Sequence, residues 1–129
     1  MLSHRRGPHS ANLRRALAPL CAEGALVIGF GSFTHNLRIL NREAINVPGL
    51  PGSAAFVSWF DAALMGSWID DLLAYRGLAP AAVEQHPTDE HLLSVFVALG
   101  AAGDGARAKR LHSNVEFGAL RMDSYAFPA

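Results

Sequence analysis

The chain has 129 residues, of which 50% are hydrophobic and 17% are charged, and its eleven basic residues balance eleven acidic ones. This composition predicts one globular domain over residues 1–129 and excludes a disordered chain. Without a surplus of lysine and arginine, no nucleic-acid partner is expected. No apolar run approaches the roughly 20 residues of a membrane-spanning helix, so no membrane partner is expected either. The single cysteine, Cys21, fits a reducing compartment, and we expect a cytoplasmic protein.

The first third of the chain predicts a helix and then a buried strand. Residues 11–22 place apolar side chains on one face at helical spacing, and Gly24 is suited to end that helix. The amino end is also rich in arginine and poor in acids, as organellar transit peptides are, but the helical period assigns it to the fold. Residues 25–30 form an apolar run long enough for one buried strand.

A glycine-containing turn is predicted next, and it carries a histidine. Gly29 and Gly31 permit a tight turn, because glycine accepts positive φ at no steric cost. Ser32 or Thr34 can cap the short helix that follows. His35 is then expected at the carboxyl end of a strand and in the first turn of a helix, where open α/β sheets bind their ligands.

The rest of the chain alternates loops and helices before it ends in strands. The pattern predicts a loop at 46–52, helices at 54–65, 68–77, 79–85 and 88–99 (the last capped by Thr88), and strands at 107–113 and 117–125 joined near Asn114. The aromatic cluster of Phe56, Trp59 and Phe60 is expected in the core. Three strands are few for about six helices. We therefore expect an α/β fold, a mixed sheet flanked by helices, that is an incomplete half of a larger α/β domain.

Two of the six histidines have matching contexts. His35 and His91 each lie at or near the start of a predicted helix, 56 residues apart, and could share a metal site or an acid–base site. No short metal-binding signature supports either alternative. His86 precedes a proline and reads equally well as a solvated turn residue, while His4 and His9 have no special context. The Gly29-x-Gly31 pair also admits a dinucleotide-binding loop, although Thr34 stands where the third glycine belongs.

Residues 29–37, 86–101 and 114–127 carry three motifs that resemble, in order, those of a known family, the extradiol ring-opening dioxygenases of the 4,5-DOPA dioxygenase type. Residues 29–37 resemble its G-S-G-x-x-x-H-N-L segment. Residues 86–101 are similar to H-P-T-x-E-H-x-x-P-L-x-x-A-L-G-A, with Ser94 in place of the proline. Residues 114–127 resemble the family's terminal strands, and 72–80 its intervening helices. The resemblance covers the carboxyl-terminal half of the family only.

The resemblance implies a metal-dependent oxidoreductase that opens a catechol-type ring with O₂, with Fe²⁺ or Zn²⁺ as cofactor. It implies that His91 is a metal ligand and that His35 is a catalytic acid/base or an additional metal contact. The neighbouring Thr34 and Asn36 are expected to bind the small aromatic substrate.

The family's two other histidine ligands lie in His-Gly-Ser-Pro and Ser-Ala-His-Trp segments, and neither segment occurs here. Three alternatives are therefore open. The chain is part of a dioxygenase whose other half is missing through a truncated reading frame or a split subunit, it is a non-catalytic remnant or binding module, or, from the glycines alone, it is a dinucleotide-binding protein. Half of a sheet also has an unpaired edge, so the partners expected are a missing amino-terminal half or a second copy of the chain.

Overall fold

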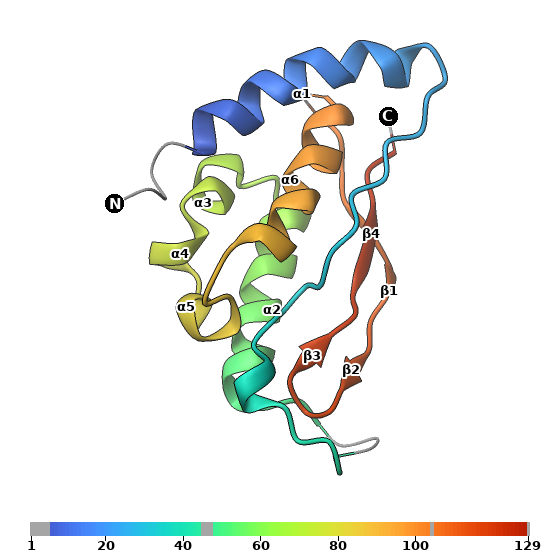
Figure 1. Ribbon diagram of the computed structural model, residues 1–129. Coiled ribbons are helices and arrows are strands. Elements are labelled where there is room, and N and C mark those ends of the chain that lie inside the picture. The colour runs from blue at the N-terminus through green and yellow to red at the C-terminus, as the bar shows by residue number, and fades with distance from the viewer. Residues whose placement is uncertain (1–5, 45–47, 104, 129) are drawn as a thin grey trace.

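The computed structural model describes residues 6–44, 48–103 and 105–128 (Figure 1). Its helices are α1 (Arg6–Ala22), the 3₁₀ helix η2 (Leu37–Ile39), α2 (Pro51–Met65), α3 (Ile69–Leu73), α4 (Tyr75–Leu78), α5 (Ala82–Gln85) and α6 (Glu90–Ala101). Its strands are β1 (Lys109–His112), β2 (Val115–Glu116), β3 (Leu120–Arg121) and β4 (Ser124–Ala126). Figure 1 shows α1 lying across one end of α6, with the strands on the opposite side of the molecule from α3, α4 and α5. The mixed α/β architecture is as predicted, and it resembles part of a larger domain.

The core is an aromatic cluster centred on α2. Phe56 and Phe60 are fully buried one helical turn apart, and Trp59 packs beside them partly buried, as the sequence predicts. The ring of Phe60 has edge-on contacts with two other rings. Its centroid lies 5.3 Å from that of Phe33 and 6.2 Å from that of Phe96 in α6. Such edge-to-face pairs add to the stability that burial alone provides. The cluster therefore joins α2, α6 and the chain segment before His35.

The carboxyl-terminal strands form one irregular antiparallel hairpin. β1 pairs with β4 and β2 with β3. The predicted second strand over 117–125 is correct only in part, since β3 and β4 fall within or at the end of that range as two separate strands. Phe117 and Gly118 both have positive φ and form a turn, where the sequence suggested a connection near Asn114. The hairpin is fixed to α2 by the Tyr125 hydroxyl, which donates to Asp61 Oδ1 at 2.7 Å.

The predicted buried strand over 25–30 is also wrong. The segment is extended but has no strand partner within the described ranges, and the side chains of Leu26, Ile28 and Phe30 are 82%, 70% and 93% exposed. An extended apolar segment becomes a buried strand only where neighbouring strands and a covering layer exist. Along this segment the chain has a helix on one side only.

Gly29 and Gly31 do not form the predicted turn, because neither has positive φ. They instead permit a close approach to α6. A Cβ atom at Gly29 would collide with the carbonyl oxygen of Ser94, and one at Gly31 with that of His91. The glycines are therefore explained by packing against a helix backbone.

Helix boundaries differ from the predictions in several places. Asn36, and not Ser32 or Thr34, caps η2, because its side-chain oxygen accepts from Arg38 N at 3.0 Å. Asp89, and not Thr88, occupies the N-cap position of α6. α2 starts at Pro51, inside the predicted loop, as suits proline at a helix start; residues 45–47 lie outside the described ranges. The predicted helix at 68–77 divides into α3 and α4.

Gly24 follows α1 with φ +94°, so the predicted helix end is confirmed. None of the helices in the described part of the chain is long and apolar enough to cross a bilayer.

The contact between Gly31 and α6 predicts a stability difference between two glycine substitutions. Gly31→Ala should lower the free energy of unfolding by about 1–3 kcal/mol, because its Cβ can be accommodated only if backbone moves. Gly77→Ala is the matched control, since nothing lies within 4 Å of a Cβ there and alanine is the better helix former. Urea unfolding of both variants measures the difference. Equal midpoints would contradict the assigned contact.

Candidate active site

The segment that carries His35 is bound to α5 and to His86, the residue after it, by three hydrogen bonds. His35 N donates to Gln85 O at 2.8 Å, and Asn36 Nδ2 donates to Glu84 O at 2.7 Å. On the other side of His35, the ring of His86 lies 2.6 Å from the carbonyl oxygen of Phe33. The backbone around His35 is therefore fixed on both sides of the residue.

The structure brings His35 and His91 together. Their rings stack with centroids 3.6 Å apart and planes 20° from parallel, and both residues are half-buried. His35 reaches this position from the end of the extended segment, and His91 from the first turn of α6. The fold therefore places the two rings close enough for the shared site that the sequence left open, while their roles stay predictions.

His86 is fully buried, so the solvated-turn interpretation of this residue is wrong. A carbonyl oxygen can only accept, so Nε2 must carry the proton that is shared with Phe33 O. Nδ1 is then left as an acceptor, and it has no hydrogen-bond partner within the described ranges. Burial lowers the pKa of His86 below its ordinary value, and the nearby His35 and His91 lower it further, while the bond to Phe33 opposes them. The ring is accordingly neutral at pH 7.

Thr34 and Asn36 flank His35 and are engaged within the chain. The Thr34 hydroxyl is fully buried, donates to Ala119 O at 2.7 Å and accepts from Arg121 N at 2.8 Å. Asn36 uses its oxygen for the η2 cap and its nitrogen for Glu84. Their expected contact with substrate stays a prediction.

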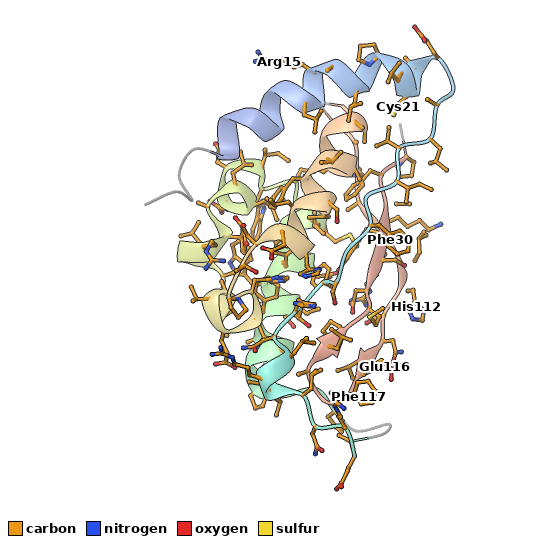
Figure 2. All side chains as sticks on the ribbon, in the orientation of Figure 1. Arg15, Cys21, Phe30, His112, Glu116 and Phe117 are labelled. Carbon is orange, nitrogen blue, oxygen red and sulfur yellow. The ribbon has the colours of Figure 1, made fainter. Side chains whose placement is uncertain are left out.

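Three further histidines occur in the chain. His112 is exposed on β1, as Figure 2 shows, His9 lies in α1, and His4 lies outside the described residues. Across the described ranges, no group of three histidine, cysteine or acidic side chains is arranged to hold a metal ion.

Two buried polar residues beneath the site were missed in the sequence. Ser53 Oγ donates to Gln85 Oε1 at 2.6 Å, and both side chains are fully buried. The spacing of Ala82, Gln85 and His86 could have indicated this, because residues i, i+3 and i+4 share one helix face and Ala82 is apolar. A buried polar pair on that face supports the α5 carbonyls to which the His35 segment is bound.

The hydrogen bonds of Thr34 predict a second stability difference. Thr34→Val should lower the free energy of unfolding by about 1–3 kcal/mol, because it leaves Arg121 N without its acceptor and leaves Ala119 O with only the longer bond from Ser53. Thr88→Val is the matched control at an exposed position and should change it by less than about 0.5 kcal/mol. Thermal or urea unfolding provides the measurement, and a Thr34 variant as stable as the control would show that these bonds contribute nothing.

Comparison with known proteins points to one family. No family model matches the chain. The "4,5-DOPA dioxygenase extradiol" of Beta vulgaris is 38% identical over 125 residues, which are 97% of this chain and 46% of that protein. The proteins of the same name from Portulaca grandiflora and Mirabilis jalapa are 35% and 33% identical, over 92% and 82% of this chain and 44% and 39% of their own lengths.

A solved structure shares the fold. The crystal structure of an uncharacterized protein from Escherichia coli K12 superimposes with a TM-score of 0.76 at 25% identity, covering 92% of this chain and 49% of the other. The chain thus spans slightly less than half the length of the curated relatives it matches, the share expected of a carboxyl-terminal half. Over that length, the chain belongs to the family of the 4,5-DOPA extradiol dioxygenases.

Proposed function

We propose that this chain supplies one wall of the active site of a metal-dependent extradiol dioxygenase, which opens a catechol-type ring with O₂. The observation that carries the proposal is the stacked pair of His35 and His91. Both side chains can transfer protons or bind a metal, and they are in contact although 56 residues separate them in the sequence. The names of the plant relatives support the reaction class, since each is a DOPA extradiol dioxygenase.

The stacking geometry favours one metal ligand and not two. A metal ion lies close to the plane of each imidazole that binds it, at about 2.0–2.1 Å from nitrogen for zinc. Two rings that stack 3.6 Å apart and only 20° from parallel do not direct their lone pairs at one point. We therefore propose His91 as the ligand and His35 as the group that faces substrate, which narrows the two roles considered for His35.

The described residues supply only part of a metal-binding site. His91 can supply one nitrogen ligand, and the described ranges contain no further group that completes a set of three. A bound ferrous ion would supply the open coordination positions and the redox chemistry that ring opening by O₂ requires. Zn²⁺ fits the same nitrogen donor but has no redox chemistry, which favours iron.

His35 is proposed as the general acid/base. In this role it takes a proton from a catechol hydroxyl and returns a proton as the ring opens beside the diol. Both oxygen atoms of O₂ enter the muconate semialdehyde product, so the reaction needs no external reductant. Thr34 and Asn36 were expected to bind substrate, and their bonds within the chain support a positioning role toward His35 as well.

The remaining ligands are proposed to come from a complementary half of the domain. The relatives are about twice as long as the stretch matched here, which leaves room for the other ligands. In this account residues 1–129 are one part of the catalytic domain, and the single cysteine is consistent with a cytoplasmic location.

A second candidate is a non-catalytic module of the same fold. It is favoured by the incomplete ligand set of the described residues and by the full use of the Thr34 and Asn36 side chains within the chain. Metal content separates this candidate from the first more directly than turnover does.

The test assembles the chain with the part of the Beta vulgaris relative that lies outside the match, with DOPA as substrate. His91→Ala should lose both bound Fe²⁺ and O₂ consumption. His35→Ala should keep the metal and slow ring opening by at least about 100-fold, because a proton-transfer group is removed. His112→Ala, an exposed histidine on β1, is the control and should behave as wild type.

Metal content and product absorbance are read on the same samples, and the isolated chain should bind no stoichiometric Fe²⁺. Normal turnover by His35→Ala would reject its acid/base role, and loss of metal in that variant would make it a ligand. An assembly that binds no metal and consumes no O₂ would favour the non-catalytic module.

A further inference from the structure

The extended segment 25–31 has two faces of different character. The Cβ directions of Gly29 and Gly31 point into α6, and Val27 on the same side is half-buried. On the other side, Leu26, Ile28 and Phe30 stand exposed. This alternation with a period of two is that of a strand with one face packed against a helix. Figure 2 labels Phe30 on this segment, between α1 and η2.

The backbone polar groups of the segment are also unpaired within the described ranges. Within the described ranges, no hydrogen bond involves an N–H or C=O group of residues 26–31. The carboxyl-terminal strands pair with one another, whereas further along the chain Phe33 O and His35 N bond to His86 and Gln85. Unpaired donors and acceptors along an extended segment are what an added strand requires.

A large apolar groove lies beside the segment. Its volume is about 700 Å³, and α6 and the carboxyl-terminal strands line it together with the segment. Apolar side chains from three parts of the chain face it, among them Leu26, Ile28, Leu111 and Met122. Contiguous exposed apolar surface of this kind marks a protein interaction site.

We infer that residues 26–31 are a docking edge, and that its occupant is the complementary half of the family's domain, which adds a strand to this edge and covers Leu26, Ile28 and Phe30. The lengths argue for this occupant: proteins that contain the matched stretch hold at least as many residues again. A second copy of this chain would bring a short edge of the same kind and no missing ligand. The inference rests on the proposed function for its occupant, but it concerns assembly and not chemistry.

The experiment mixes the full chain with the part of the Beta vulgaris relative outside the match, and follows complex formation by sedimentation and backbone amide exchange. We expect a one-to-one complex in which alternate amides of residues 26–31, those that point to the added strand, exchange slowly, while all of them exchange freely in the chain alone. Ile28→Lys should weaken the complex at least tenfold, because it places a charge in the covered face. Since Ile28 is exposed in the free chain, this variant should fold normally, and slow exchange in α2 and α6 verifies that.

Val83→Lys is the matched control, an exposed branched aliphatic residue on α5 whose substitution should leave the complex unchanged. Three results would overturn the inference: no complex, a complex in which residues 26–31 still exchange freely, or self-association that protects them and is not displaced. A complex that protects the edge but opens no ring would instead count against the proposed function and leave the docking edge standing.

Discussion

The contact on which the site depends is the close approach of an extended segment to a helix. Gly29 and Gly31 let the chain run against the carbonyl oxygens of Ser94 and His91 on α6, where any side chain would collide. The same segment continues into His35, and the same helix turn carries His91. This packing fixes the positions of both backbones, and the two rings stack as a result.

The rest of the fold supports that contact from below. The ring of Phe33 is anchored in the aromatic cluster of α2 and α6, and its carbonyl oxygen is held by the buried His86. The polar atoms beneath the site are nearly all paired, as buried polar groups must be. The opposite side of the segment has no such support. Two histidines supported by packing and hydrogen bonds on one side, and an exposed apolar segment on the other, are features expected of half a domain.

The sequence predicted the helices and the aromatic core, because helical spacing carries that information, and the family resemblance assigned His35 and His91 to one site. It failed where the outcome depends on neighbours distant in sequence. The run at 25–30 has the composition of a buried strand, and only the lack of a pairing strand leaves it exposed. Likewise, the sequence around Gly29 and Gly31 does not distinguish a turn from contact with a helix about 60 residues later. The burial of His86 depends on its contact with Phe33, which is 53 residues away in the sequence.

Whether this chain forms the histidine wall by itself is best tested by the proximity of the His35 and His91 rings in the isolated chain in solution. Nuclear Overhauser effects between their ring protons report it without any partner, metal or substrate. The account predicts strong cross-peaks between the two rings, since the wall is formed by this chain alone. Rings that show no cross-peak in a folded chain would contradict it, because the site would then need the complementary half to form.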